Sequence, residues 1–551
     1  MTAKPGPAAH FTTAAPHGSP ESGFALADLF AAVAEAVPDR IALLAGERRL
    51  SYRELDTRAT LVARHLRSAG IERREHVAIL AYNRAEWLES ALGVLRAGAV
   101  PVNVNYRYVA RELRHVLADA GAVALIAERS LTSRVAEIRA ELPKLRHVLL
   151  LDDGSPGTSL PGTDFENALA RTTGDRSELP PASGDDLYLL YTGGTTGDPK
   201  GVMWRQADIF RVALESRRPD VPPASSPAEL AERARARSPR RMLVLGPLMH
   251  AAGQWNALYM LLSGRTVVLN TRRPFDPADV VGVADREGVH ALQVVGDTMA
   301  RPIARQLLAD PSRCANLTTV LSGGTPLTSV VRELWREWRP DIALNDSYGG
   351  TETGVCGASG AVDGTDAPSF TMGASVAVLD SELRPLPAGS EEVGRIARTG
   401  RIPLGYYNDP ERTARTFPRD SEGRRWAISG DYGTIAADGS VRLLGRGSAV
   451  INTGGEKVYP EEVESVLKAH PDIDDTIVVP APDDHLGQQV CAVIAAVPGR
   501  RPSEEQLRAH CRTRLAGFKV PRAFHLVDQV RRTAVGKQDY RWAMAVARRS
   551  A

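Results

Sequence analysis

The sequence predicts an α/β protein: a large N-terminal domain with parallel-rich sheets covered by helices, then a small α+β domain. Short β-branched runs alternate with longer amphipathic segments, such as HVAIL before RAEWLESALGVLRAGA and VALIA before SRVAEIRAEL. This alternation is typical of parallel sheets covered by helices. The chain has 551 residues, more than one hydrophobic core usually supports. After Gly445 the pattern restarts as a compact unit.

The pattern divides the chain into three parts. Residues 1–22 are rich in Ala, Pro, Gly and His and lack the apolar run of a signal peptide, so we expect a disordered tail. Residues 23–446 form the large domain, with further strands predicted at DLYLLYT, RTVVLN, ALQVVG and TTVLSGG. Residues 447–551 form the small domain, with helices predicted at PEEVESVLKAH and SEEQLRAHCRTRL. The Pro/Ser-rich basic segment 216–241 is interpreted as a surface insertion with a solvated face.

Composition argues against several classes of protein. The 68 basic and 66 acidic residues leave a formal charge of +2, so no overall field favours nucleic acid or an anionic membrane. The four cysteines include no CxxC pair, which indicates neither a disulfide framework nor a zinc site and fits a reducing cytoplasm. No window approaches the roughly 18 apolar residues of a membrane span. The motifs H-E-x-x-H and G-x-S-x-G, typical of metalloproteases and α/β-hydrolases, do not occur.

A glycine-rich stretch, YTGGTTGDPKG, directly follows the predicted strand LYLLYT. Backbone without side chains lets N–H groups approach an anion closely, so the stretch indicates a phosphate-binding loop. It is not a Walker A loop, because there the lysine follows a glycine, whereas Lys200 lies between Pro199 and Gly201.

The stretch resembles the signature loop of the adenylate-forming superfamily, which comprises acyl-CoA synthetases, nonribosomal peptide adenylation domains and luciferases. The resemblance covers roughly residues 25–545 and implies that the loop holds the β- and γ-phosphates of ATP, with Thr196 also beside Mg²⁺. The implied phosphate contacts are Thr192, Gly193, Gly194, Thr195, Thr196, Gly197 and Lys200.

Further stretches follow in the order that the resemblance requires. In LNDSYGGTETG, it implies that Tyr348 stacks on adenine, Thr351 contacts the α-phosphate and Glu352 holds Mg²⁺. ISGDYG and LLGRGS would supply Asp431 and Arg446 to the ribose. The other implied nucleotide contacts, several of them in the adenine-side wall SGGTPL, are Gly324, Thr325, Pro326, Asp346, Gly349 and Lys457.

The small domain carries two more matches. INTGGEKVYPEEVE resembles the segment that lines the path of the thiol after the domain rotates, with Gly455 beside the substrate. RRTAVGKQDYR resembles the terminal motif whose lysine, here Lys537, reaches into the active site to stabilise developing charge. The small domain is therefore expected to be mobile about a hinge at Ser448, and the implied catalytic residues are Lys537, Glu352 and Thr351.

More narrowly, PVNVNYRY, GVMWRQADIF and RIPLGYYNDPERT resemble the bacterial fatty-acid branch, which includes ligases for steroid-derived carboxylates. The implied enzyme uses ATP and Mg²⁺ to convert a hydrophobic acid to acyl-AMP and transfers the acyl group to coenzyme A. Where peptide-synthetase domains place an Asp for the substrate amino group, this chain has His250, so amino acids are disfavoured. The implied substrate contacts are His250, Gly323 and Gly455.

Other interpretations stay open at this point. An acyl-AMP ligase that loads a carrier protein would use the same nucleotide residues, and a luciferase-like oxygenase would need pocket features that sequence does not give. A catalytically silent adenylate-binding protein is disfavoured because both Glu352 and Lys537 are present. His250 could instead be a buried structural histidine. A cytoplasmic location, no nucleic-acid partner, no integral membrane contact and a homodimer complete the expectations.

Overall fold

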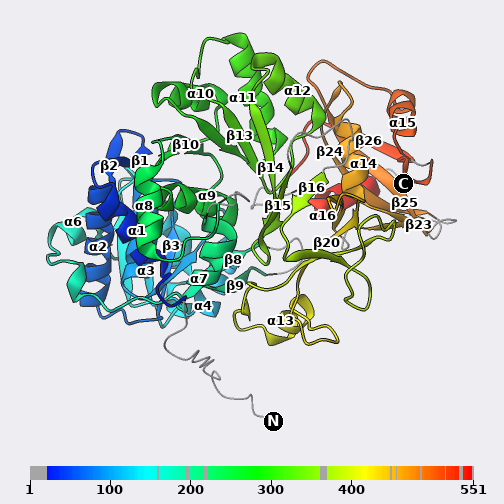
Figure 1. The fold of residues 1–551 in the computed structure, drawn as a ribbon. Helices are drawn as coiled ribbons and strands as arrows, with labels where there is room; N and C mark the ends of the chain where they lie inside the picture. Colours follow the sequence, from blue (N-terminus) through cyan, green and yellow to red (C-terminus); the bar gives the residue numbers. More distant parts are fainter. Residues whose placement is uncertain are drawn as a thin grey trace.

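The computed structural model describes residues 21–157, 160–193, 198–215, 221–359, 369–446, 450–453, 456–483, 487–515, 517–532 and 538–548. Within these residues the strands form sheets of 13, 8 and 5 strands. Figure 1 shows the first two sheets and their helices in the large domain and the third in the small C-terminal domain. None of the described helices is long and apolar enough to span a bilayer.

The 8-stranded sheet follows the order β19-β9-β8-β4-β3-β5-β6-β7. It is parallel from β8 to β7, and β9 and β19 are added antiparallel. Alternate residues of β3 face two cores, Val77 and Ile79 toward α1–α3 and Ala78 and Leu80 toward α4 and α5, as expected for a strand buried on both sides. The strands are β3 (His76–Leu80), β4 (Val100–Asn103), β5 (Ala124–Glu128), β6 (His147–Leu151), β7 (Thr163–Asp164), β8 (Leu187–Thr192), β9 (Lys200–Arg205) and β19 (Gly405–Tyr406). The helices are α1 (Leu26–Ala36), α2 (Tyr52–Ser68), α3 (Ala85–Arg96), α4 (Ala110–Asp119), α5 (Ser133–Glu137) and α6 (Phe165–Ala170).

The 13-stranded sheet has a parallel half and an antiparallel half. Its order is β17-β18-β20-β21-β16-β15-β14-β13-β12-β10-β11-β1-β2, and the pairs from β14 to β1 are parallel. The parallel strands are β1 (Ile41–Ala45), β10 (Arg241–Val244), β11 (Thr266–Leu269), β12 (Ala291–Val294), β13 (Thr319–Gly323) and β14 (Ala343–Gly350), and β2 (Arg48–Ser51) closes that edge. The antiparallel strands are β15 (Gly354–Ser359), β16 (Ser369–Met372), β17 (Val376–Leu379), β18 (Gly394–Arg398), β20 (Ala427–Ile435) and β21 (Val441–Arg446).

Helices cover both faces of the parallel half. Apolar residues of α10, α11 and α12 form one core with this sheet, and α9 belongs to the larger core that it shares with the 8-stranded sheet. Helix α8 lies beside α1 (Figure 1). The bounds of these helices and of the others in this part of the chain are α7 (Gln206–Ile209), which continues as a π-helical turn (Phe210–Leu214), α8 (Pro227–Ala236), α9 (Ala251–Leu262), α10 (Pro277–Arg286), α11 (Asp297–Ala309), α12 (Ser329–Trp338) and α13 (Pro410–Thr416). The predicted parallel-rich α/β architecture is confirmed.

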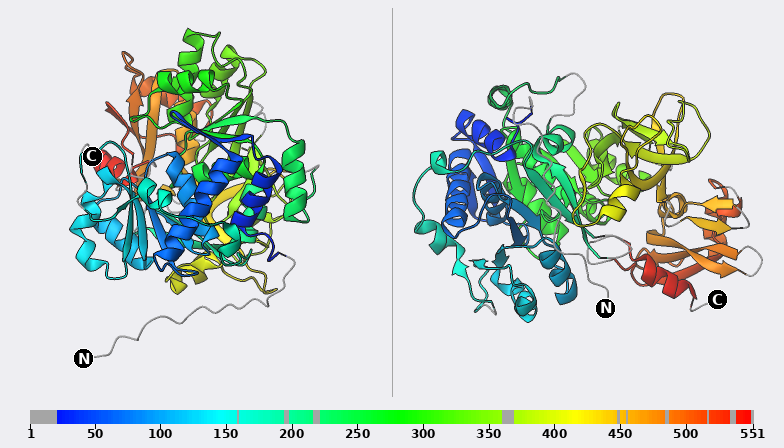
Figure 2. Two further views of the ribbon diagram at one scale, coloured as in Figure 1. Left: turned by 90° about the vertical axis from the view of Figure 1, so that its left-hand side faces the viewer. Right: turned by 90° about the horizontal axis from the view of Figure 1, so that it is seen from below.

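The small domain is a separate sheet with helices on both faces. Its strands follow the order β23-β22-β25-β24, and β26 pairs with β25. They are β22 (Ile451–Thr453), β23 (Glu456–Val458), β24 (Ile473–Asp483), β25 (Gly487–Ala496) and β26 (Ala523–Val527), with helices α14 (Pro460–Lys468), α15 (Glu504–Arg512) and α16 (Tyr540–Arg548). In Figure 2 this unit lies at one end of the molecule. Sheet membership changes between Arg446 in β21 and Ile451 in β22, while the boundary itself and the hinge at Ser448 stay predictions.

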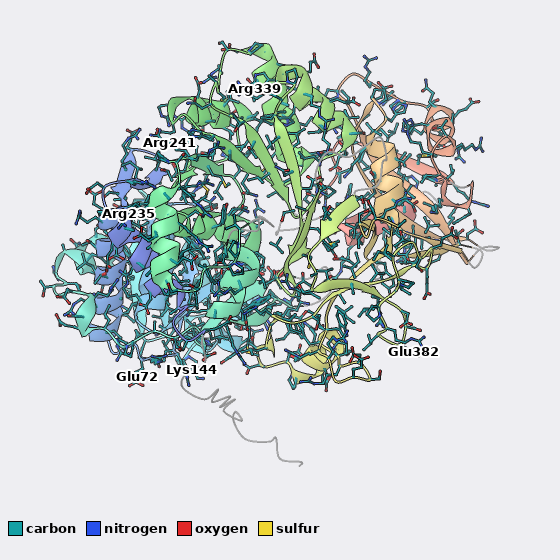
Figure 3. The ribbon with its side chains drawn as sticks, in the orientation of Figure 1. Glu72, Lys144, Arg235, Arg241, Arg339 and Glu382 are labelled. Carbon is teal, nitrogen blue, oxygen red and sulfur yellow. The ribbon has the colours of Figure 1, made fainter. Side chains whose placement is uncertain are left out.

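Segment 216–241 contains a helix that packs on the large domain. Helix α8 buries Leu230, Ala231 and Ala234, and the Arg40 guanidinium donates to the carbonyls of Ala234 and Arg237 at 2.9 and 3.1 Å, which caps the helix. Of its two arginines, Arg235 is exposed and faces outward, as Figure 3 shows, and Arg233 is half-buried. The expected solvated face therefore exists, but the opposite face belongs to the fold.

A histidine pair joins α2 to β6. The Nε2 atoms of His65 and His147 are 3.0 Å apart, so one ring must donate and the other accept. Burial, and next the His65 ring and Arg146, lower the pKa of His147 to about 4, and burial lowers that of His65.

This pair predicts a loss of stability in mild acid. The unfolded chain takes up protons near the ordinary pKa of about 6.5, whereas folded His147 does so only near 4. The stabilising contribution is therefore present above pH 6.5 and is lost as the pH falls toward 4. After allowance for solvent screening, we expect about 1–2 kcal/mol less stability at pH 5 than at pH 7 from this site.

The measurement is the melting temperature at pH 7 and pH 5 for the native protein and for His147→Gln, which keeps a hydrogen-bonding side chain. The native protein should lose more degrees than the variant. His525→Gln, at a half-buried histidine of β26, is the matched control and should behave as the native protein. Equal losses in all three proteins would contradict this prediction.

Candidate active site

The predicted nucleotide motifs meet at the carboxyl ends of β13 and β14. These strands are parallel neighbours, with Ser322 opposite Asp346 and Gly323 opposite Ser347. SGGTPL therefore lies beside the end of SYGG, at the sheet edge where open α/β sheets bind ligands. Gly324 has φ +90°, a conformation that favours glycine.

A tight turn between β14 and β15 presents Thr351 and Glu352. Gly350 is opposite Gly354 in the ladder, and the Thr353 hydroxyl accepts from the Gly350 amide at 3.0 Å. A Cβ on Gly349 would lie 2.2 Å from the Gly354 carbonyl oxygen, so only glycine allows this approach. The indole N–H of the fully buried Trp204 donates to the Thr351 carbonyl at 2.9 Å. The buried Trp204 indole thus supports the turn through this hydrogen bond.

Three side chains from distant segments converge beside this turn. The Lys200 Nζ lies 3.1 Å from Glu352 Oε1 and donates to the Tyr406 hydroxyl at 2.7 Å. The Tyr406 hydroxyl donates in turn to Glu352 Oε1 at 2.9 Å. Burial, and next the Glu352 charge, raise the pKa of Tyr406 far above its ordinary value. The phenol therefore keeps its proton and stays a donor to the carboxylate.

Tyr406 is a site residue that sequence reasoning did not single out. It lies in RIPLGYYNDPERT, where neither composition nor spacing connects it to Lys200 or Glu352. Only the antiparallel pairing of β19 with β9, which sets Tyr406 opposite Val202, brings it to this position.

The predicted adenine and ribose residues form a second cluster. The Tyr348 hydroxyl and the Ser429 hydroxyl each donate to Asp431 Oδ2 at 2.9 Å. Asp431 is opposite Arg446 in the β20–β21 ladder, so two residues predicted for the ribose occupy neighbouring positions. Tyr348 is 8% exposed and tilts against Phe370 with ring centroids 5.3 Å apart. Its stacking on adenine stays a prediction.

Asp346 has a different environment from the other predicted nucleotide contacts. It is 2% exposed, and its carboxylate is ion-paired with Arg332 and accepts from the Leu327 amide at 3.1 Å and the Ser359 hydroxyl at 3.3 Å. Burial raises the pKa of Asp346, and the Arg332 charge opposes this. With its carboxylate engaged inside the protein, Asp346 offers a nucleotide only its backbone.

The predicted acyl-side residues lie against one helix. His250 is the N-cap of α9, and its carbonyl accepts from the Gln254 amide at 3.0 Å. A Cβ on Gly323 would lie 3.7 Å from the Cβ of Ala252 in the first turn of α9. The end of β13 therefore faces the start of α9, so Gly323 and His250 are near each other although they are far apart in sequence.

Several predicted residues lie outside the described residues: Gly194, Thr195, Thr196, Gly197, Gly455 and Lys537. Thr192 and Lys200, on either side of the glycine loop, face each other across the β8–β9 ladder. The segments on either side of 533–537 are anchored to β24, where Arg532 is ion-paired with Asp475 and the Gln538 side chain donates to the Thr476 carbonyl at 3.1 Å. Of Arg446 and Lys457 only the backbone is described.

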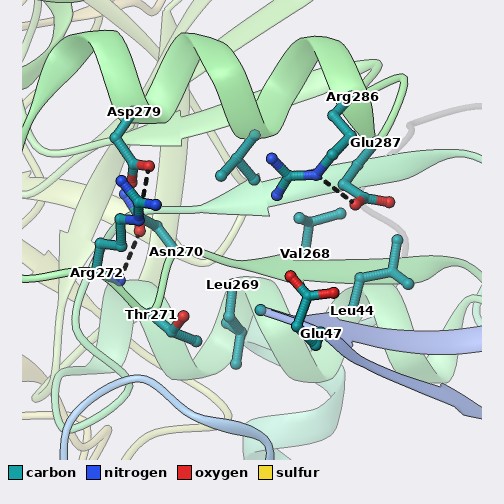
Figure 4. Close-up of a pocket in the computed structure, with 12 residues that line it drawn as sticks. Leu44, Glu47, Val268, Leu269, Asn270, Thr271, Arg272, Asp279, Arg286 and Glu287 are labelled. Carbon is teal, nitrogen blue, oxygen red and sulfur yellow. Dashed lines mark hydrogen bonds and ion pairs between the residues drawn. The ribbon is translucent and has the colours of Figure 1, made fainter.

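A cavity elsewhere in the large domain does not involve these residues. It has a volume of about 120 Å³ and lies between β1, β11 and α10. Figure 4 shows its wall, with Arg272 ion-paired to Asp279 and Arg286 to Glu287. None of the predicted site residues lines it, so it does not bear on the site described above.

Comparison with protein families identifies the chain. The family described as "AMP-binding enzyme" matches residues 30–407, and "AMP-binding enzyme C-terminal domain" matches residues 462–537. The chain belongs to the AMP-binding enzyme family. The resemblance inferred from the motifs is thereby confirmed, and both matches of this enzyme family fall within the predicted large and small domains.

One curated relative and several solved structures are similar to nearly the whole chain. A medium/long-chain-fatty-acid–CoA/3-oxocholest-4-en-26-oate–CoA ligase of Mycolicibacterium smegmatis is 41% identical over 532 residues, which is 95% of this chain and 96% of the relative. The anthranilate CoA ligase AuaEII in complex with anthranoyl-AMP shares the fold with a TM-score of 0.81 at 23% identity, covering 95% of this chain and 97% of that one. The amide bond synthetase McbA of Marinactinospora thermotolerans has a TM-score of 0.77 at 25% identity, covering 94% and 99%.

Proposed function

We propose that this protein is an ATP-dependent acid:CoA ligase that activates a hydrophobic carboxylic acid, fatty acid-like or steroid-derived. The observation that carries the proposal is the ion pair between Lys200 and Glu352, whose Nζ and Oε1 atoms are 3.1 Å apart. Glu352 follows β14, the strand that also carries Tyr348 of the Tyr348–Asp431 cluster. An ammonium and a carboxylate beside an aromatic–acid pair suit a nucleoside triphosphate and its metal ion. The 41% identity to a CoA ligase for medium- and long-chain fatty acids and a steroid carboxylate supports the substrate class.

In the first half-reaction, a carboxylate oxygen of the acid would bond to the α-phosphorus of ATP. The bond from this phosphorus to the bridging oxygen breaks, and pyrophosphate leaves. Such a transfer depends mainly on positioning and on neutralising charge. Lys200 would bind phosphate oxygens, while Tyr348, Asp431 and Arg446 would bind adenosine.

Glu352 would hold Mg²⁺. One carboxylate beside substrate phosphates is a ligand set that this ion commonly takes, and Glu352 offers a carboxylate at the turn that also presents Thr351. The side chain is only 15% exposed, so its charge is weakly screened by water. When bound, Mg²⁺ would neutralise negative charge on the phosphates.

In the second half-reaction, the sulfur of coenzyme A would attack the acyl carbonyl carbon. The bond between the acyl carbon and the phosphate oxygen breaks, its electron pair leaves with AMP, and the thiol proton is released to water. Because an amide bond synthetase shares this fold, architecture alone does not choose the acceptor. Coenzyme A is proposed from the identity to the CoA ligase.

The acid is proposed to lie between the end of β13 and the start of α9. Gly323 has no side chain to fill the space there, and His250 is the N-cap residue of α9. The segment MHAAGQW contains no acidic residue, so it offers no counter-ion for a substrate amino group. An apolar acid therefore fits better than an amino acid.

The test is release of AMP and pyrophosphate with short, medium, long, aromatic and steroid-side-chain acids, each with and without coenzyme A. We expect one hydrophobic class to give AMP and thioester together, in a coenzyme A-dependent manner. Adenylate that forms but is not transferred to coenzyme A would instead indicate a carrier-protein acceptor. No AMP with any acid would contradict the proposed function. The homodimer and the cytoplasmic location stay predictions.

A further inference from the structure

The Tyr406 hydroxyl bonds to both charged side chains, accepting a hydrogen bond from Lys200 and donating one to Glu352. An ammonium can only donate and a carboxylate can only accept, whereas a phenol does both. Lys200 donates to the Tyr406 oxygen at 2.7 Å, and this oxygen's proton points to Glu352 Oε1 at 2.9 Å. Lys200 also lies over the Tyr406 ring, 4.4 Å from its centroid, where the ring face attracts a cation.

The backbone of Tyr406 is held rigidly. Strand β19 pairs with β9, with Gly405 opposite Met203, and the Tyr406 amide donates to the Thr413 hydroxyl of α13 at 2.9 Å. A Cβ on Gly405 would lie 2.5 Å from Thr413 Cγ2, so strand and helix are in close contact. The ring is 3% exposed and tilts against Phe417 at 5.7 Å. Its hydroxyl is therefore fixed relative to β9, the strand that begins at Lys200.

Under the proposed function Lys200 binds phosphate and Glu352 binds Mg²⁺, so binding of the metal–nucleotide substrate would weaken their direct ion pair at 3.1 Å. Tyr406 can stay bonded to Glu352 during this exchange, because its support comes from β9 and α13 and not from the ion pair. A carboxylate that is already held in its binding orientation loses less conformational entropy when it binds the ion.

We propose that Tyr406 is a positioning residue for adenylation, whose hydroxyl holds Glu352 in the orientation that binds the divalent cation of the nucleotide. This inference rests on the proposed function. It assigns Tyr406 no contact with the substrate. It requires the hydroxyl group and not merely an aromatic ring.

The test is Tyr406→Phe, which keeps the ring and removes only the hydroxyl. The direct readout is binding of Mn²⁺ in the presence of α,β-methylene ATP, followed by electron paramagnetic resonance. A lost hydrogen bond to a charged group corresponds to about a 10- to 100-fold effect, so we expect cation binding to weaken by about tenfold or more. In pyrophosphate release, the Mg²⁺ requirement should rise while KM for the acid stays unchanged.

Tyr407→Phe is the matched control, since it deletes the same atom one residue later in the chain. It should leave cation binding unchanged. Melting temperatures of both variants show whether they fold. A double-mutant cycle with Glu352→Gln separates positioning from general packing: if Tyr406 acts through Glu352, the Tyr406→Phe change should have little further effect once the carboxylate is gone.

Equal cation affinity in native protein and Tyr406→Phe would overturn the inference, as would full additivity in the cycle. These results differ from failure of the proposed function, which would appear as absence of AMP formation by the native protein with every acid. The Mn²⁺ titration does not depend on turnover, so it tests Tyr406 in either case.

Discussion

Replacing Lys537 with alanine is expected to lower the rate of acyl-adenylate formation by about 10²- to 10³-fold, the usual effect of removing one preorganised donor from developing charge. By family resemblance this lysine neutralises charge as the carboxylate attacks the α-phosphorus. The anchoring of Arg532 and Gln538 to β24 ties both sides of segment 533–537 to the small domain. The effect should therefore be on the chemical step and not on folding.

The measurement is pyrophosphate release at saturating ATP and acid, with thioester formation from added acyl-AMP and coenzyme A measured separately. We expect the first rate to fall and the second to change much less, since the adenylate is already formed. Lys144→Ala is the matched control, because Lys144 is an exposed lysine on the surface of the large domain. A Lys537→Ala protein that adenylates at the native rate would remove Lys537 from the mechanism.

Replacing Asp346 with alanine should destabilise the large domain by about 3–5 kcal/mol, as is usual when one partner of a buried ion pair is removed. The side chains of Asp346 and Arg332 are 2% and 4% exposed. The change would leave the Arg332 guanidinium buried without its carboxylate, and the Leu327 amide would lose its acceptor. The cost comes from uncompensated polar groups inside the protein.

The measurement is the first thermal or urea transition, because a two-domain chain need not unfold in one step. Asp341→Ala, at an exposed aspartate shortly before β14, should change stability by less than about 0.5 kcal/mol. If Asp346 bound the nucleotide through its carboxylate, the variant would keep its stability and lose ATP affinity instead. That result would contradict the structural role proposed for the Asp346 carboxylate.

The antiparallel half of the large sheet was not foreseen in detail. Strand–helix alternation predicts parallel neighbours because a helix must carry the chain back across the sheet. The short connection between β14 and β15 favours antiparallel pairing, and the sheet continues antiparallel through β16, β21, β20, β18 and β17. The alternation of apolar residues locates such strands in the sequence. Which strands pair depends on which strand edges come together in the folded domain.

The sequence by itself determined the α/β class, the large domain with its small C-terminal partner, and the family, and it predicted the phosphate loop. These depend on local chemistry: the period of apolar residues, the conformational freedom of glycine, and the order of short motifs along the chain. Only the tertiary structure decided which side chains work together. It joined Tyr406 to Lys200 and Glu352, paired Tyr348 with Asp431, and buried Asp346 against Arg332. Each of these contacts depends on strand register and packing between segments far apart in the chain, which no local pattern specifies.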